Sequence, residues 1–427
     1  MSTMRYSEMK DSGVDWIGEI PKNWKTLRLK FVTQCQDGKR IPVDAGQRKK
    51  GPYPYWGAGA IMDYVNDFIF DDDLVLLGED GAPFFDLTRN VAHHVSGKIW
   101  VNNHIHVLKP KTNINASFLT HYLNVTNYRS YINGSILNKL TQSNMNKIMV
   151  VLPSLTEQEV IAAYLDEKCA AINEIIQQAK ATIEEYKEWK ASVIFEAVTK
   201  GLDPDAEMKD SGVEWIGEIP KHWSCIPMKY LLNERNQKND PIVTSERLSL
   251  SIDIGVTLYA EKTTNLDRFK EDVSQYKVAH EGDLVLNSMN MIVGAVGVAP
   301  ILGCVSPAYY VFYDKDKNYT LTRYCDYIFK NKRLRGCLFS LGQGIMAIDR
   351  GDGRVNTCRL KVSRDDLGRI MLPCPPVEEQ HIIISYLDKL CKNIDTIISE
   401  KQALIDELEN YKKSLIFETV TGKRRVC

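Results

Sequence analysis

The stretch "PDAEMK", residues 204–209, contains two carboxylates and a lysine in an order that could hold a divalent metal. It imitates the Pro-Asp…Glu-x-Lys motif of many nucleases, in which carboxylate oxygens bind a metal that assists hydrolysis. In those enzymes the two acids come from separate strands, whereas Asp205 and Glu207 stand close together just after a predicted helix end. We therefore interpret the stretch as a linker. A stand-alone nuclease is kept as an alternative, which DNA cleavage with magnesium alone would support.

Histidines are the other residues that suggest a metal, because imidazole is a common ligand. His93, His94, His104 and His106 are close in sequence, yet no cysteine or carboxylate stands beside them at ligand spacing. The ten cysteines are scattered and form no C-x-x-C pair, which in a long cytosolic chain favours reduced thiols. We predict half-exposed histidines on strands, no metal site and no disulfide.

The sequence also lacks the common nucleotide and catalytic motifs. It contains neither a G-x-x-x-x-G-K-[ST] loop nor a G-x-G-x-x-G turn, and neither H-E-x-x-H nor an N-P-P-Y/F adenine pocket. We therefore predict that this chain holds no catalytic residue and no cofactor.

Basic and aromatic residues alternate in "GKRIPVDAGQRKKGPYPYWGAG", residues 38–59. With glycine and proline between them, they suit an exposed loop along DNA, where Lys and Arg contact phosphate or guanine. The alternative is a solvated loop whose aromatic side chains pack inward. The candidate DNA contacts in this loop are Lys39, Arg40, Arg48, Lys49, Lys50, Tyr55 and Trp56.

A second candidate stretch is "HHVSGKIWVNNHIHV", residues 93–107, which offers His94, Asn102 and Asn103. Asparagine can pair with adenine in the major groove, but it is equally a residue of hairpin turns. Lys139 is a further candidate, although its stretch at 133–147 carries less positive charge.

In the second half of the chain, the candidates come from "LNSMNMIVGAVG" (286–297) and "GQGIMAIDRGDGRVNTCRLK" (342–361). Both stretches combine glycine with side chains able to match base edges. The predicted contacts are Asn287, Asn290, Gln343, Arg350, Arg354, Asn356 and Arg359.

The elements that must position these loops are shown by a repeat. "MKDSGVDWIGEIPKNW" begins at Met9, and "MKDSGVEWIGEIPKHW" begins at Met208. A second repeated block begins at Pro153 and again at Pro375, whereas the residues between the blocks are almost unrelated. The order is thus opening peptide, variable body and helical block, twice over, and 427 residues are enough for two or more domains.

In each helical block the apolar residues recur in steps of three, four and seven, there is no internal proline or glycine, and acids stand in the first turns. This spacing predicts a coiled-coil helix of ~45 residues, about 65 Å long at 1.5 Å per residue. Acidic starts and basic ends favour antiparallel packing of the two helices on each other. The apolar positions include Ile161, Leu165, Ile172 and Ile176 in the first block, and Ile383, Leu387, Ile394 and Ile398 in the second.

The variable bodies, about 25–150 and 224–372, combine strand-like runs such as "DLVLLG" and "YYVFYD" with helical patches such as "FLTHYLN". We predict an α+β fold: two mixed α/β domains joined by two long antiparallel coiled-coil helices, as a pseudo-twofold tandem duplication. The expected domains are 1–152, 153–201, 202–374 and 375–427.

Bulk composition excludes some functions. A net charge of −1 provides no general basic field for nucleic acid, so binding would need local patches or a partner. No apolar run reaches the ~18 residues of a membrane span, and the N-terminus lacks a signal-peptide core. We expect a cytoplasmic protein without a membrane partner.

Together these features resemble the specificity (S) subunit of type I restriction-modification systems. The resemblance covers the whole chain. It rests on "S-G-V-x-W-I-G-E-I-P-x-x-W" at Ser12 and Ser211, on "P-x-x-x-E-Q-x-x-I-x-x-Y-L-D" at Pro153 and Pro375, and on the "S-x-I-F-E-x-V-T" helix endings.

The resemblance implies that the two bodies are target-recognition domains, each reading one half of a split sequence in double-stranded DNA. It implies that the helices set the distance between the halves and bind two methyltransferase (M) subunits, joined by restriction (R) subunits. S-adenosylmethionine, and ATP with Mg, would then be bound by those partners. The other alternative is a coiled-coil scaffold with two exchangeable ligand-binding heads and no role with DNA.

The repeated opening peptide is expected to pack against the helices instead of contacting bases. Trp16 and Trp215, with Ile17 and Ile216, would fill the junction between helix and body. We predict that the first copy lies beside the C-terminal end of the second helix, near Thr421.

Overall fold

The structure is a computed structural model that describes residues 6–86, 88–132, 138–252, 254–262, 272–314, 320–345 and 359–426. Two compact units are present: the first comprises Met1–Ala181 with Glu400–Cys427, and the second comprises Thr182–Ser399. Each unit therefore holds one variable body and a part of both long helices.

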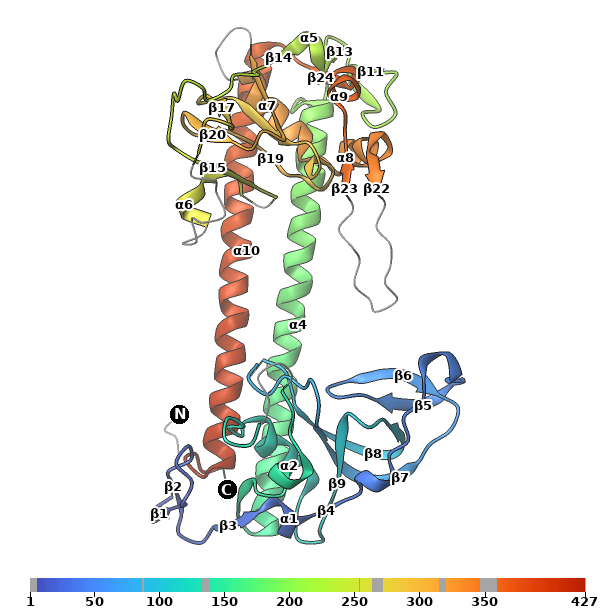
Figure 1. Cartoon of the computed structure of the whole chain (residues 1–427), viewed down its shortest axis with the longest axis vertical. Helices are drawn as coiled ribbons and strands as arrows, with labels where there is room; N and C mark the ends of the chain where they lie inside the picture. Colours follow the sequence, from blue (N-terminus) through green and yellow to red (C-terminus); the bar gives the residue numbers. More distant parts are fainter. Residues whose placement is uncertain are drawn as a thin grey trace. The chain divides into compact units, whose positions relative to one another are not determined.

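The long helices are α4 (Leu155–Lys200) and α10 (Val377–Val420), and Figure 1 draws them in green and red. Most of their predicted apolar positions are buried, and Leu165 in the first unit and Leu387 in the second are fully covered, whereas Ile398 is half-buried. Since propensity alone does not hold long helices in water, this burial provides most of their stability.

The direction of the helices follows from their polar contacts. In the first unit, Lys412 Nζ donates to Asn173 Oδ1 at 2.8 Å, and Lys180 lies 4.0 Å from Glu409. Numbers rise along α4 as they fall along α10, so the helices run antiparallel. In the second unit, Lys190 pairs with Asp395 at 2.7 Å in the same sense. The antiparallel prediction is confirmed.

The first body is built on a six-stranded sheet of order β4-β9-β7-β8-β5-β6. Its longest pairing joins β7 to β8 antiparallel, and β5 joins β8 parallel at Tyr55 and Trp100. Helix α2 packs on β7 and β8 and borders α4 (Figure 1). The elements are β4 (Thr33–Cys35), β5 (Lys50–Trp56), β6 (Ile61–Val65), β7 (Phe70–Gly78), β8 (Ala92–Val101), β9 (Ile105–Pro110), α1 (Leu29–Val32), α2 (Ala116–Asn124) and α3 (Gln142–Met145).

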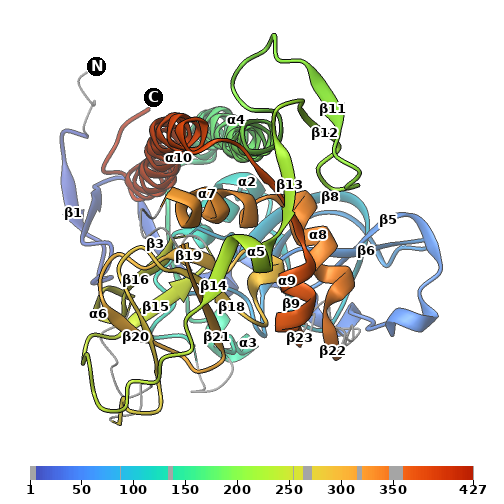
Figure 2. The ribbon, with the colours of Figure 1, turned by 90° about the horizontal axis from the view of Figure 1, so that it is seen from above.

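The second body has a smaller main sheet of order β14-β21-β18-β19, with several two-stranded pairs around it. Helix α7 packs on this sheet and lies beside α10 (Figure 2). The elements are β14 (Leu232–Glu234), β15 (Leu248–Ser251), β16 (Gly255–Leu258), β17 (Lys277–Ala279), β18 (Leu284–Asn287), β19 (Val296–Val298), β20 (Gly303–Val305), β21 (Tyr309–Asp314), β22 (Gln343–Ile345), β23 (Arg359–Lys361), α5 (Met228–Leu231), α6 (Tyr259–Lys262), α7 (Thr320–Phe329), α8 (Lys332–Leu341) and α9 (Arg364–Arg369).

Both bodies are closed at their base by the strands through which the chain enters and leaves. In the first unit, β3 (Lys25–Arg28) pairs antiparallel with β10 (Met149–Leu152). In the second, β13 (Ser224–Pro227) pairs in the same way with β24 (Met371–Cys374). Each body thus joins its helix through a two-stranded base, although the main sheets of the two bodies differ.

The repeated opening peptide folds alike in both copies. Strand β1 (Met9–Asp11) pairs with β2 (Glu19–Pro21), as β11 (Met208–Asp210) pairs with β12 (Glu218–Pro220). The turns need positive φ at glycine, for example 69° at Gly13, a conformation that other residues adopt at a cost. This need explains why the glycines recur in both copies.

Glycine also ends each long helix where the opening peptide docks. Gly422 has φ 73°, and a Cβ there would lie 2.2 Å from Pro21 Cδ. Lys423 Nζ donates to the carbonyl of Ile17 at 2.5 Å, and the Trp16 ring lies 6.2 Å from Phe417. The first copy therefore packs at the end of α10, as the sequence predicted.

Candidate nucleic-acid interface

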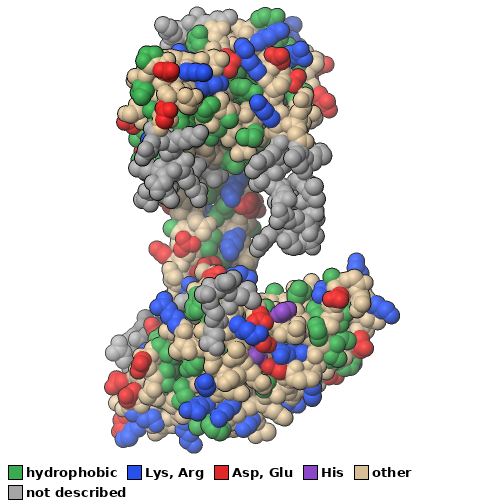
Figure 3. Space-filling view, in the orientation of Figure 1, with side chains coloured by type: hydrophobic (Ala, Val, Ile, Leu, Met, Phe, Trp, Pro, Cys, Tyr) green, Lys and Arg blue, Asp and Glu red, His purple; other side chains and the backbone are tan. Residues whose placement is uncertain are grey.

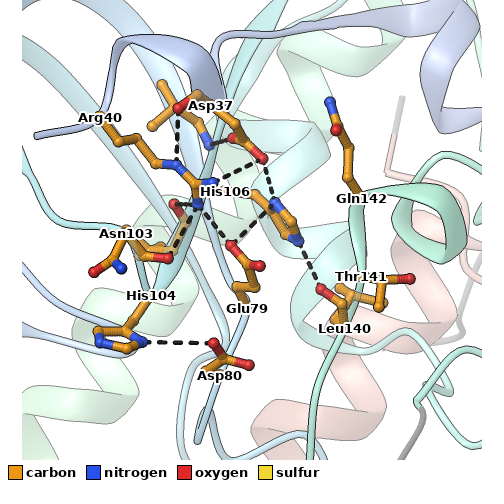
Figure 4. A network of polar contacts seen from close by, with 12 residues as sticks. Asp37, Arg40, Glu79, Asp80, Asn103, His104, His106, Leu140, Thr141 and Gln142 are labelled. Carbon is orange, nitrogen blue, oxygen red and sulfur yellow. Dashed lines mark hydrogen bonds and ion pairs between the residues drawn. The ribbon is translucent and has the colours of Figure 1, made fainter.

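A polar network joins the loop after β4 to two strands of the first sheet (Figure 4). Arg40 Nη1 donates to Glu79 at 2.6 Å and to the carbonyl of Ile105 at 2.9 Å. His106 lies between Asp37 and a main-chain carbonyl. Its Nδ1 is 2.6 Å from Asp37 Oδ2, and its Nε2 is 2.8 Å from the oxygen of Leu140. These contacts hold the 37–40 turn against the sheet.

The network balances its charges internally. Burial alone would raise the pKa of Asp37, but the hydrogen bond and charge of His106, the Val107 amide and Arg40 together lower it. At the edge, Lys139 lies 3.1 Å from Asp80 and 3.5 Å from Glu79. Arg40 and Lys139 are thus opposed by carboxylates within the first unit.

Asp37, Glu79 and His106 place one possible ligand atom each within 4.8 Å of one another. A cation needs these atoms free, yet the guanidinium of Arg40 already pairs with both acids, at 3.6 Å from Asp37 and 2.6 Å from Glu79. Both nitrogens of His106 are also taken, one facing the Asp37 carboxylate and the other the Leu140 carbonyl. The cluster therefore fits an internal salt-bridge network better than a metal.

The predicted DNA-contact loop has both exposed and buried members. Lys39, Lys49 and Lys50 are exposed. Tyr55 is only 1% exposed, and its hydroxyl accepts from the Val43 amide at 3.0 Å. Its inward packing matches the alternative that the sequence left open for aromatic residues.

Two other members of this loop are half-buried. Arg48 stacks on the Tyr55 ring at 4.4 Å and lies 3.6 Å from Asp63. Trp56 stacks on His93 at 5.0 Å, and its indole nitrogen is buried without a partner in the described residues. Both side chains help to fix the shape of the β5–β6 hairpin.

The candidate DNA contacts in residues 93–107 also include both exposed and buried side chains. His94 is exposed but pairs with Asp73 at 2.6 Å, and Asn103 is exposed. Asn102 is 6% exposed, and its side-chain oxygen accepts from the His104 amide at 2.9 Å, as a turn residue does. Tyr55 and Asn102 are buried and Arg40 is held by Glu79, so we do not carry these three forward as proposed DNA contacts.

Lys98 is a further cationic residue of the 93–107 stretch, and it is exposed. Its ammonium lies 4.6 Å from the Phe68 ring centre and 5.9 Å from that of Tyr53. Because the aromatic rings restrict its position, such an exposed ammonium is well placed to donate a hydrogen bond to a DNA phosphate. Along β8 the exposed Lys98 alternates with the buried Ile99.

In the second unit, Asn290 and Gln343 are exposed. Asn287 is 8% exposed, and its side-chain oxygen accepts from the amides of Met289 and Asn290, at 3.1 and 3.3 Å. Asn287 therefore closes a turn that presents Asn290. Three further candidates, Arg350, Arg354 and Asn356, and the side chain of Arg359 lie outside the described residues.

The linker that imitates a nuclease motif lies on the surface of the second unit. Asp205 and Glu207 are exposed, and Glu207 pairs with Lys221 at 2.9 Å. They belong to the loop between α4 and β11, as the linker interpretation predicts.

Charge on the visible face of each unit is mixed, with acidic side chains between the Lys and Arg side chains (Figure 3). On this face, a nucleic-acid interface would therefore be local. Among the described helices, none is both long enough and apolar enough to cross a lipid bilayer.

Comparison with known proteins gives the family. The model of the type I restriction modification DNA specificity domain matches residues 21–185 and again 216–410. A protein of Haemophilus influenzae named as type I restriction enzyme specificity subunit S.HindORF215P is 25% identical over 86% of this chain and 86% of its own length. The type I restriction enzyme EcoDI specificity subunit of Escherichia coli is 20% identical over 95% of this chain and 90% of its own.

A solved structure of a type I restriction-modification system shows the same fold. Its chain is 14% identical, with a TM-score of 0.62, over 94% of this chain and 99% of that chain. The two domain matches coincide with the two repeats in the sequence. The chain belongs to the type I restriction modification DNA specificity domain family, and it is a DNA sequence-specificity subunit with two recognition domains.

Proposed function

We propose that each body of this subunit reads one half of a split DNA sequence while the long helices bind two methyltransferase subunits. The observation that carries the partner assignment is a second apolar surface on α4 and α10, separate from the buried seam. We call it the flank patch. In the first unit it comprises Val160, Tyr164, Ile175 and Tyr411, and in the second Ile382, Tyr386, Ile397 and Trp189.

Six of the eight flank-patch residues are exposed and two, Tyr164 and Ile397, are half-buried, where a helix surface is usually polar. In the first unit, Val160, Ile175 and Tyr411 are 39%, 46% and 51% exposed. Lys168 Nζ lies 5.9 Å from the ring centre of Tyr164, so the apolar side chain is bordered by a solvated cation.

Helix geometry separates this patch from the seam. At about 100° per residue, positions 160, 164 and 175 fall within roughly 60° of arc, and the seam at 165, 172 and 176 is centred about 100° away. The patch therefore cannot be covered by the sister helix.

The second unit repeats the patch position by position. Ile382 and Trp189 are 60% and 47% exposed, and Ile382 and Tyr386 stand at the places of Val160 and Tyr164 in the repeated block. Two equivalent apolar patches suit two copies of one partner. Family resemblance supplies the partner, the M subunit.

The methylation and ATP-driven reactions of the complex would be carried out by the M and R subunits. S-adenosylmethionine would be bound by the M subunits, and ATP with Mg by the R subunits, leaving this chain non-catalytic. Mixed surface charge supports weak DNA binding by the isolated chain and tighter, salt-sensitive binding once M subunits are present.

The test combines stoichiometry with methylation mapping. Light scattering of the purified complex is expected to give two M subunits per chain. Sequencing of modified DNA is expected to show two short blocks separated by an unread spacer, because each body reads its own block. One continuous block, or equal DNA affinity with and without M, would count against the proposal.

A further inference from the structure

An aspartate of the repeated "Y-L-D" motif holds the recognition body to the long helix in each unit. In the first unit, Asp166 of α4 accepts from Ser117 Oγ at 2.9 Å and lies 2.7 Å from His121 Nε2. Both partners belong to α2. The hydrogen bond of His121, against the opposing effect of burial, lowers the pKa of Asp166.

The second unit has the same contact with different partners. Asp388 of α10 pairs with Arg323 and accepts from Tyr327 OH at 2.6 Å. Both partners belong to α7. Each long helix thus uses one carboxylate to hold one body helix.

The partner positions are equivalent in sequence as well. Residues 120–122 read Thr-His-Tyr, and residues 322–324 read Thr-Arg-Tyr, so His121 and Arg323 occupy the same place. The tyrosines that follow are fully buried, and each donates to a main-chain carbonyl at 2.8 Å. The bodies share this short motif although their sheets differ.

The helices that carry the motif pack directly on the sheets from which the candidate DNA-contact loops extend. In the first unit, Phe118 and Leu119 are fully buried, and α2 packs on β7 and β8. A rotation of α2 on α4 would therefore turn the whole sheet. The Asp166 side chain is 56% exposed, so its ion pair contributes little to folding stability and can act mainly on orientation.

We infer that Asp166 and Asp388 are positioning residues for DNA recognition. They fix the angle at which each body is held on its helix, and so the spacing at which the two half-sites are accepted. This inference rests on the proposed reading of a split sequence. Neither residue need contact DNA.

The test measures spacer tolerance in the complex with M subunits. Methylation rates are compared on DNA with the preferred spacer and with spacers one base pair longer or shorter. In Asp166→Asn and Asp388→Asn, the preference for the correct spacer is expected to fall about three- to tenfold, the range of an ordinary net hydrogen bond. The melting temperature should stay within about 3 °C of wild type.

Two further variants make the result specific. His121→Arg copies the second unit and should keep the spacer preference, whereas His121→Ala should relax it even if Asp166→Asn folds poorly. Glu167→Gln is the matched control, because Glu167 is 72% exposed and pairs only with Lys168 in the described contacts.

The outcomes separate the two claims. Unchanged spacer preference in Asp166→Asn and His121→Ala would overturn the positioning role. A wild-type complex that accepts every spacer equally, or reads no split site, would instead refute the proposed function. A loss of preference in Glu167→Gln as large as in Asp166→Asn would also overturn the inference.

Discussion

The two bodies differ most in their sheets and least in the contacts that join them to the helices. The first body has a six-stranded sheet, and the main sheet of the second has four strands. Yet Trp24 Nε1 donates to Glu157 at 3.2 Å as Trp223 Nε1 donates to Glu379 at 2.8 Å. The attachment to the helices is therefore the property that the two bodies share, while the sheet beyond it is free to vary.

The largest effect is expected from the shared tryptophans. Trp24 is 1% exposed and Trp223 is fully buried, so Trp24→Ala and Trp223→Ala should each cost about 3–5 kcal/mol through lost burial and a cavity. Chemical denaturation should show similar losses in the two units. Trp189→Ala, at an exposed position, should stay within about 0.5 kcal/mol. A tolerated Trp24→Ala would show that the attachments are not equivalent.

Acid sensitivity should distinguish the first unit through Asp37. Asp37→Asn is expected to cost about 2–3 kcal/mol at neutral pH. The carboxylate that faces His106 Nδ1 at 2.6 Å, accepts from the Val107 amide at 2.8 Å and lies 3.6 Å from Arg40 would lose its charge. The native pKa of Asp37 is lowered, so this contribution is fully present above the unfolded value of about 3.9 and is lost as pH falls through the native pKa. Denaturation at several pH values should show the wild-type advantage shrinking only below about pH 4. A constant difference would contradict the assignment.

The flank patch tests whether the two units bind partners alike. Trp189→Ser and Tyr411→Ser should each weaken M-subunit binding by about 1–2 kcal/mol, or roughly tenfold, without unfolding the chain. Titration calorimetry measures this, with the neighbouring Glu188→Gln as the control. If only one variant weakens binding, the two patches are not equivalent docking surfaces.

The smallest effect is expected from single lysines on the first reading surface. Lys49→Ala and Lys50→Ala should each reduce the salt dependence of DNA binding by about one phosphate contact, and weaken all sequences alike. Fluorescence anisotropy at several salt concentrations measures the slope. Lys22→Ala, in the opening peptide, should leave it unchanged. An equal slope in all three variants would remove this loop from the interface.

Sequence alone predicted the long helices, their direction and the docking of the first opening peptide, because repeated heptads and terminal charges are strong local signals. It did not predict the partners of Arg40. Glu79 is 39 positions away and meets it only through the register of the strands. Three-residue motifs such as those at 120–122 and 322–324 are too short to be noticed without the contact that explains them.

The burial of individual side chains limits which of the predicted DNA-contact residues can reach DNA. Tyr55 and Asn102 have residue types common in interfaces, yet strand alternation and turn chemistry place them inside. Lys49 and Lys50 stand in the same stretch as Tyr55 and are exposed. Residue types were enough to predict which stretch could contact DNA. Which side chains of that stretch face solvent depends on the position of each residue along its strand.

The most direct test exchanges one reading surface. Residues 29–148 can be replaced by the corresponding body of a related specificity subunit, leaving both base strands, the opening peptides and the helices unchanged. Methylation mapping is then predicted to show one half of the recognised sequence replaced, with the other half kept. A change in both halves, or an unchanged sequence, would contradict the claim that each body reads its own half-site.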